Sequence, residues 1–213
     1  MNIANAIWTL RKHNAEFKDE KDSFLRLLRP YVGIKNQHFC EIIKALYFAA
    51  PELNSVRANR DLTFTIWSMT RNARYWTAGK REPMFHGKDF IGQEDKTILD
   101  RWIALIESIT LDLLRGQTNW RALERIAEEV NLHDTISEAD WLTIPFTKLL
   151  KYHYQMESHG GFSDDEEILC RALKRIGTPN SETFDLLELI GSDSKFESVR
   201  IAALDTAHSL RGG

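Results

Sequence analysis

The sequence predicts an all-α protein, in which an irregular helical bundle is followed by stacked helix pairs. Apolar residues recur at helical spacing in nearly every segment, and almost no segment alternates like a strand. The 213 residues include only five prolines and 11 glycines, so few breaks interrupt these stripes. Residues 181–210 read as two helices joined by a short turn, a unit that must stack on a neighbour to bury its apolar faces. We therefore expect about nine to eleven helices.

Four helices are expected in the first third of the chain, over residues 4–13, 19–28, 37–50 and 59–76. Pro30 disfavours a helical conformation at the preceding residue and ends the second helix, and Pro51 closes the third. Apolar residues three and four apart mark the buried face of each helix. Residues 77–92 hold three glycines and Pro83, and this longest irregular stretch is a candidate functional loop or subdomain boundary.

Six further helices are expected over residues 94–115, 120–130, 137–156, 163–176, 182–190 and 196–210. Pro145 lies inside one of them and is expected to kink it or split it in two. Ser163 and Glu166 have the spacing of a capping box at a helix start. The acidic run 164–167 then lies where the positive end of the helix favours it.

Charge and composition suggest two regions and a cytoplasmic location. We expect an N-terminal helical region over 1–92 and a repeat-like region over 93–213, unless the two form one continuous domain. Residues 1–90 carry 15 Lys/Arg against 9 Asp/Glu, whereas residues 91–213 carry 13 against 22. The sequence shows no apolar run of about 18 residues and no signal-peptide pattern, so no membrane partner is expected. Cys40 and Cys170 lie in apolar helical contexts, which fits buried free thiols in a reducing compartment.

The last part of the chain, about residues 163–210, resembles HEAT-like α-helical repeats. The resemblance lies in LLELIGSDSKFESVRIAAL, where an apolar helix is followed by a turn and by a second helix rich in small residues. Shifting residues 199–207 back by 31 positions superimposes their apolar pattern on residues 168–176. The family places an Asp in the turn and an Arg in the second helix, where they form a polar ladder between repeats. The resemblance therefore implies this role for Asp193 and Arg200.

The leading functional hypothesis is a non-enzymatic protein-binding module with an acidic surface. Its carboxylates would face a basic protein partner, as in immunity proteins that neutralise a nuclease toxin. The candidate partner-binding residues are Asp164, Asp165, Glu166, Glu167, Glu182, Asp185 and Glu188. No cofactor is expected.

The alternative hypothesis is RNA binding or RNA cleavage through residues 71–86. Cations and aromatic rings alternate there, a pattern that can meet phosphates and stack on bases. The candidate residues of this surface are Arg71, Arg74, Tyr75, Trp76, Lys80 and Arg81. Arg81 and His86 have the Arg-x4-His spacing of HEPN ribonucleases, and the resemblance implies that they would act as the catalytic pair. The competing interpretation is that Trp76 packs in the core while the cations cover a helix end.

No metal site is predicted from the sequence. His153 and Glu157 share one helical face and His159 follows closely, but no established metal-binding motif includes them. A packing or surface role for His153 is the simpler interpretation. Trp67, Trp102, Trp120 and Trp141 are expected in the core, because they lie in helical stripes or at helix starts.

Overall fold

The computed structural model describes most of the chain. The described residues are 1–19, 21–55, 57–77, 91–115, 119–132, 140–157 and 163–212. They form ten α-helices and one short 3-10 helix, and within these ranges the only β-type pairing is an isolated bridge between Leu28 and Tyr31. The all-α prediction is confirmed. The chain divides into two compact units, Met1–Ala122 and Leu123–Gly213.

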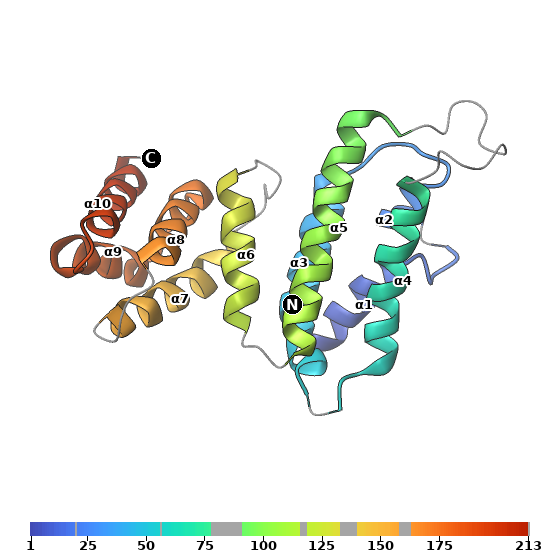
Figure 1. Cartoon of the computed structure of the whole chain (residues 1–213), viewed down its shortest axis with the longest axis horizontal. Coiled ribbons are helices and arrows are strands. Elements are labelled where there is room, and N and C mark those ends of the chain that lie inside the picture. Colours follow the sequence, from blue (N-terminus) through green and yellow to red (C-terminus); the bar gives the residue numbers. More distant parts are fainter. Residues whose placement is uncertain are drawn as a thin grey trace. The chain divides into compact units, whose positions relative to one another are not determined.

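The first unit is a bundle built on three long antiparallel helices. Its helices are α1 (Ile3–His13), α2 (Phe24–Leu27), α3 (Asn36–Leu53), α4 (Arg60–Thr77) and α5 (Gln93–Leu114). Helix α4 runs opposite to α3 and α5, and α1 packs across α3 and α4 (Figure 1). The sequence assigned α5 to the C-terminal region, whereas the structure packs this helix on α3 and α4.

The core of the first unit is an aromatic stack surrounded by aliphatic side chains. The rings of Phe39 and Trp102 lie parallel, with centroids 4.7 Å apart and an interplanar angle of 5°. Both side chains are fully buried, as are Leu46 and Ile66. Burial of each such side chain contributes about 1.5–3 kcal/mol to folding.

Two buried histidines join α1, α2 and α3. The Phe24 N–H donates to Nδ1 of His13 at 3.2 Å, so this nitrogen accepts and Nε2 carries the proton that faces Glu41 at 2.9 Å. The hydrogen bond from His13 lowers the pKa of Glu41 to about 2. The ring of His38 lies 5.0 Å from that of His13, and burial lowers the pKa of His38 to about 4.

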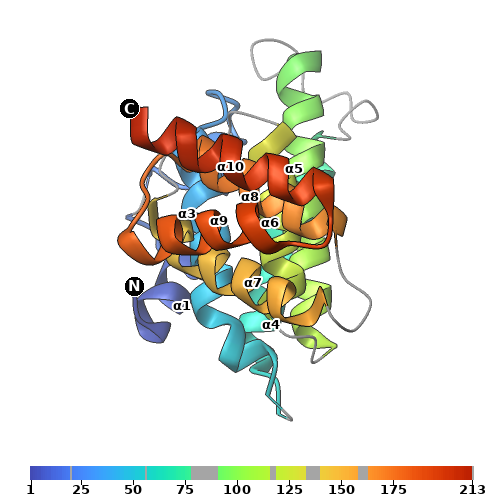
Figure 2. The same cartoon turned by 90° about the vertical axis from the view of Figure 1, so that its left-hand side faces the viewer.

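The second unit stacks two helical hairpins. Its elements are α6 (Asn119–Leu132, whose first turn belongs to the first unit), η1 (Asp140–Leu142), α7 (Thr143–Met156), α8 (Ser163–Ile176), α9 (Ser181–Asp193) and α10 (Glu197–Gly212). Helix α7 pairs with α8, and α9 pairs with α10. The hairpins stack because α7 also contacts α9 and α8 contacts α10, and Figure 2 shows α9 and α10 side by side. The prediction of packed helix pairs in this part of the chain is confirmed.

Small and polar residues set the spacing of these helices. Asn180 caps α9 by accepting from the Thr183 N–H at 2.8 Å. Gly191 lets α10 come close, because a Cβ at this position would lie 2.6 Å from Cγ and Cδ2 of Leu204. Arg200 of α10 donates to the Ser194 carbonyl in the turn at 2.6 Å. A separate hydrogen bond, between Tyr154 and Asp193, links α7 to the end of α9.

That link does not match the polar ladder expected from the HEAT resemblance. Asp193 accepts from the Tyr154 hydroxyl of α7 at 2.7 Å, so it does connect the two hairpins. Arg200 instead stays within its own hairpin.

Three helix boundaries differ from the sequence predictions. Helix α2 has a single turn, because the residues before Phe24 are polar and have no apolar face to bury. Helix α3 continues through Pro51 to Leu53, where the proline costs one hydrogen bond in the last turn and Leu53 is fully buried. Pro145 neither kinks nor splits α7, since it lies in the first turn, where its missing N–H is tolerated. The residues before Asp140 in the predicted helix 137–156 lie outside the described residues.

Each unit contains one buried free cysteine, Cys40 in α3 and Cys170 in α8. Cys170 is fully buried, which raises the pKa of its thiol. Among the described helices, none combines the length and the apolar character needed to cross a bilayer.

Candidate functional site

The predicted acidic surface is divided in the structure, because most of its residues have partners of their own. Glu167 pairs with Arg171, Glu188 pairs with Arg211, and the Glu182 carboxylate lies 3.6 Å from the Lys151 ammonium. Of the seven candidate residues, Asp164 and Asp185 are exposed and make no ion pair within the described part of the chain. These neighbouring cations therefore reduce the negative potential that would attract a basic partner.

Glu166 lies in the interior instead of on the surface. Its side chain is fully buried, and burial, together with the charge of nearby Glu157, raises the pKa of Glu166 to about 7. The capping box with Ser163 is therefore not formed, because the carboxylate turns inward beside Glu157. Glu157 itself accepts from the Ser194 hydroxyl at 2.5 Å and from the Lys195 N–H at 3.0 Å.

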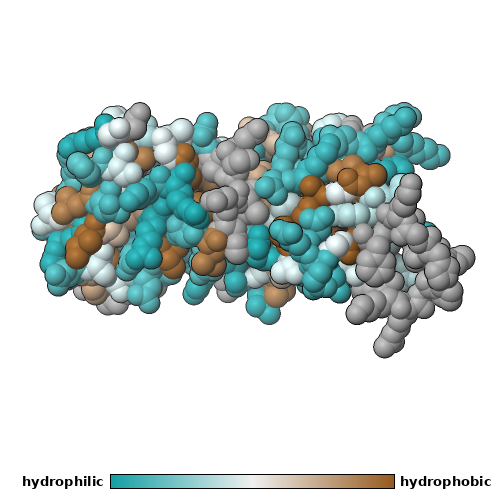
Figure 3. All heavy atoms as spheres, turned by 90° about the horizontal axis from the view of Figure 1, so that it is seen from above, coloured by the Kyte–Doolittle hydropathy of each residue, from teal (hydrophilic) through white to brown (hydrophobic). Residues whose placement is uncertain are grey.

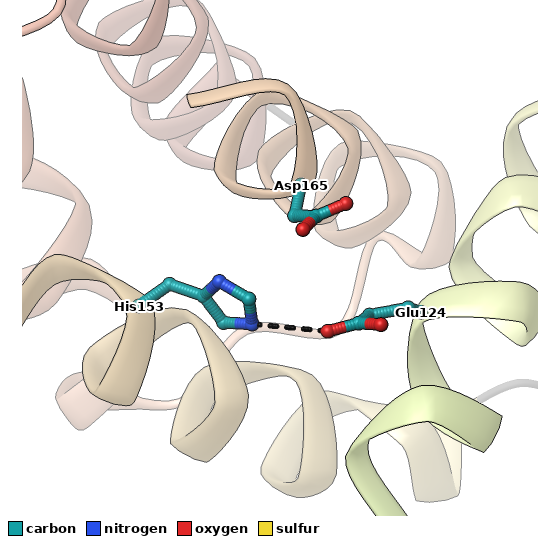
Figure 4. Close-up of side chains that lie close together, drawn as sticks. All are labelled: Glu124, His153 and Asp165. Carbon is teal, nitrogen blue, oxygen red and sulfur yellow. Dashed lines mark ion pairs between the residues drawn. The ribbon is translucent and has the colours of Figure 1, made fainter. Parts of the chain in front are cut away.

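The structure brings His153 to a carboxylate that the sequence did not suggest. Its Nε2 lies 3.3 Å from Oε1 of Glu124 in α6, and the imidazole is almost completely buried. Asp165 of α8 completes a group whose three ligand atoms all lie within 4.8 Å of one another. In Figure 4 the imidazole points from α7 toward Glu124, and the Asp165 carboxylate points into the space beside them. His159 lies outside the described residues.

The basic-aromatic segment is described only in its first part. Arg74 makes a two-armed ion pair with Glu107 of α5, at 2.9 and 2.5 Å, and Trp76 is half-buried. Arg71 and Tyr75 are exposed, and the Arg71 guanidinium lies over the Trp67 ring, 4.8 Å from its centroid. Lys80, Arg81 and His86 lie outside the described residues, so the HEPN-like pair stays a prediction.

Helix α4 presents a second apolar face, directed away from the core. Because each helical residue turns by about 100°, the residues opposite the buried stripe of α4 can be found by counting. They are Arg60, Phe64, Trp67, Arg71 and Tyr75, and all five are exposed. Phe64 is 63% exposed and Trp67 is 50% exposed, which is unusual for such large apolar side chains.

An open groove runs along this face. It has a volume of about 890 Å³ and is lined by Arg57, Ala58, Arg60, Thr63, Phe64, Trp67 and Leu114. The rings of Phe64 and Trp67 lie 5.8 Å apart at an angle of 37°. Arg57 and Arg60 line the groove with the aromatic pair, and neither makes an ion pair with another residue in the described ranges.

Exposed apolar side chains by themselves do not mark this site. Hydrophobic side chains reach the surface in several separate places (Figure 3). The α4 face differs because aromatic rings, an aliphatic side chain and arginines adjoin one groove. The prediction that Trp67 lies in the core is wrong. The signal that could have corrected it was the angle of Trp67 to the stripe of Leu62 and Ile66. Of the other three tryptophans, Trp102 is in the core as predicted, whereas Trp120 and Trp141 are only partly buried.

Comparison with protein families, curated proteins and solved structures finds nothing that matches this chain.

Proposed function

We propose that the protein is a non-enzymatic helical binding module that holds a partner protein on the outer face of α4. The observation that carries this proposal is the groove in which Phe64, Trp67 and Leu114 are flanked by Arg57 and Arg60. An apolar centre with a charged rim is the usual anatomy of a protein interface. Trp and Arg are also among the residues that most often dominate binding energy.

The partner that fits this groove is an amphipathic helix with acidic residues beside its apolar face. Such a helix would place apolar side chains between Phe64 and Leu114 and carboxylates against Arg57 and Arg60. Leu111, one turn before Leu114 in α5, is 46% exposed and extends the apolar surface. The exposed side chains of Leu111 and Leu114 favour a protein partner over a nucleic acid, because an aliphatic side chain offers no ring or guanidinium plane on which a base could stack.

Three further properties are part of the proposal: a cytosolic location, membership of the HEAT-like repeats and a toxin-neutralising role. A cytosolic role is supported by the two free buried cysteines. Membership of the HEAT-like repeats is supported by the stacked hairpins α7–α8 and α9–α10. A toxin-neutralising role depends on the acidic residues, of which Asp164 and Asp185 are the exposed ones without an ion pair in the described ranges.

The test is site-specific photo-crosslinking in cells that make the full chain. p-Benzoylphenylalanine is placed at position 64, and the matched control carries it at position 8. Trp8 lies in α1 and is also about half-exposed. Its ring stacks on that of Phe17, and it does not line the groove. We expect a protein adduct at position 64 that is absent at position 8. Its attachment site should be an apolar residue within an acidic helical segment.

The affinity of the purified partner identified from the adduct is then measured for the wild-type protein and its variants. The double substitution Phe64→Ala and Trp67→Ala should weaken binding by about 30-fold or more, as expected for interface hot spots. The same change at Trp8 should leave the affinity unchanged. An RNA or DNA adduct at position 64 would instead support the nucleic-acid alternative. An adduct within the same chain would show that the face is covered by the protein itself, and would refute the proposal.

A further inference from the structure

Three helices of the second unit bring together one imidazole and two carboxylates. Glu124 comes from α6, His153 from α7 and Asp165 from the first turn of α8. Their separation along the chain means that only the stacking of these helices places them in one group (Figure 4). His153 is 2% exposed, whereas Glu124 and Asp165 are partly exposed. The imidazole is therefore buried, whereas both carboxylate side chains are partly accessible to solvent.

The distances suit a divalent ion after a small adjustment of one side chain. Nitrogen and oxygen ligands bind Zn²⁺ at about 2.0–2.2 Å, which places two ligands of a tetrahedral ion about 3.3–3.6 Å apart. Nε2 of His153 and Oε1 of Glu124 already lie 3.3 Å apart. The Asp165 oxygen lies at most 4.8 Å from each of the other two ligand atoms. A side-chain rotation that moves this oxygen by about 1 Å would bring it to the separation expected for a tetrahedral ion.

Two further carboxylic side chains, those of Glu157 and Glu166, lie in the interior close to the group in the chain. Glu157, the C-cap residue of α7, lies one turn after His153 and is 6% exposed. Glu166 is next to Asp165 and is completely buried. A divalent cation held by the group would interact favourably with carboxylates buried near it, since charge is screened only weakly in the interior.

We propose that Glu124, His153 and Asp165 form a binding site for a divalent transition-metal ion, with Zn²⁺ as the best-fitting species. An imidazole with two carboxylates suits a borderline ion better than Mg²⁺ or Ca²⁺, which prefer oxygen ligands alone. Three protein ligands leave the fourth position of a tetrahedral ion to water. The ion would tie α6, α7 and α8 together. This site is independent of the groove on α4.

The test is metal binding to the full-length chain after treatment with EDTA and dialysis. Isothermal titration with Zn²⁺ should show one ion bound per chain, and Mg²⁺ should not compete. Co²⁺ should give visible absorption bands of a low-symmetry, four-coordinate ion. His153→Gln and Asp165→Asn should each weaken Zn²⁺ binding by at least about tenfold. The matched controls are His208→Gln and Glu197→Gln, which remove the same functional groups from exposed positions of α10 and should not change binding.

Each alternative has a distinct result. If the wild-type chain binds no ion, or if both ligand substitutions bind Zn²⁺ as tightly as the wild type, the three residues form an ion-pair cluster only and the proposal is overturned. Circular dichroism shows whether each variant is folded. Because Asp165 is partly exposed, Asp165→Asn keeps the test decisive even if replacement of the buried His153 unfolds the unit.

Discussion

His38 makes the first unit sensitive to mild acid, and the size of this effect can be worked out. The side chain is 1% exposed, and burial lowers its pKa from 6.5 to about 4. Lys35 adds to this shift, and so would His13 if it were protonated, whereas the carboxylates of Asp22 and Glu41 oppose it. At neutral pH the ring is uncharged in both the folded and the unfolded chain, so it contributes no pH dependence there.

Stability begins to fall at the pH where His38 becomes protonated in the unfolded chain but stays uncharged in the folded chain. This window extends from pH 6.5 down to about 4. Each pH unit within it lowers the free energy of unfolding by about 1.4 kcal/mol, so the whole window accounts for about 3 kcal/mol. Glu41 acts in a second, more acidic window, because its lowered pKa stabilises the fold above pH 4.5 and that contribution is lost as the pH falls to about 2.

The assay is urea unfolding of the full chain, followed by circular dichroism at pH 7.5 and pH 5. The wild type should lose about 2 kcal/mol more than His38→Gln over this interval, because the glutamine cannot bind the proton. His208→Gln, which removes an exposed imidazole of α10, serves as the matched control and should follow the wild type. Equal losses in the wild type and in His38→Gln would refute the reasoning.

Three substitutions test the packing and capping of the two units, each by urea unfolding at pH 7.5. Gly191→Ala should destabilise the second unit by about 1–3 kcal/mol, because the new methyl group collides with Leu204, and a neutral result would mean that α9 and α10 are less close than described. Phe39→Ala should cost about 3–5 kcal/mol by removing the ring stacked on Trp102, and a cost below about 1 kcal/mol would contradict its place in the core. Asn180→Ala should cost about 1 kcal/mol through loss of the α9 cap, whereas the aspartate variant should retain most of the stability.

The helices were predictable because their apolar stripes carry the information locally. In α5 the stripe that contains Trp102 is buried as expected, and the helix begins within one residue of the prediction. Where prediction failed, the competing effect was tertiary. Leu53 extends α3 beyond Pro51 because its burial outweighs one lost hydrogen bond, and sequence periodicity does not record that balance.

The two candidate sites differ in how far the sequence could have revealed them. The outer face of α4 could have been predicted from the sequence, since the angle between Trp67 and Ile66 around the helix axis follows from helix geometry alone. The group around His153 was not, because its partners come from α6 and α8. The register between packed helices determines which carboxylates contact the imidazole. That register depends on how the side chains of the facing helices fit together.

The buried thiols offer a built-in way to follow each unit separately. Cys40 belongs to the first unit and Cys170 to the second, and a thiol-reactive reagent can modify either one only after its surroundings open. Mass spectrometry of the two cysteine peptides would therefore give two opening rates from one unmodified chain. A binding partner on α4 should slow alkylation of Cys40, and a metal ion that ties α8 to its neighbours should slow alkylation of Cys170.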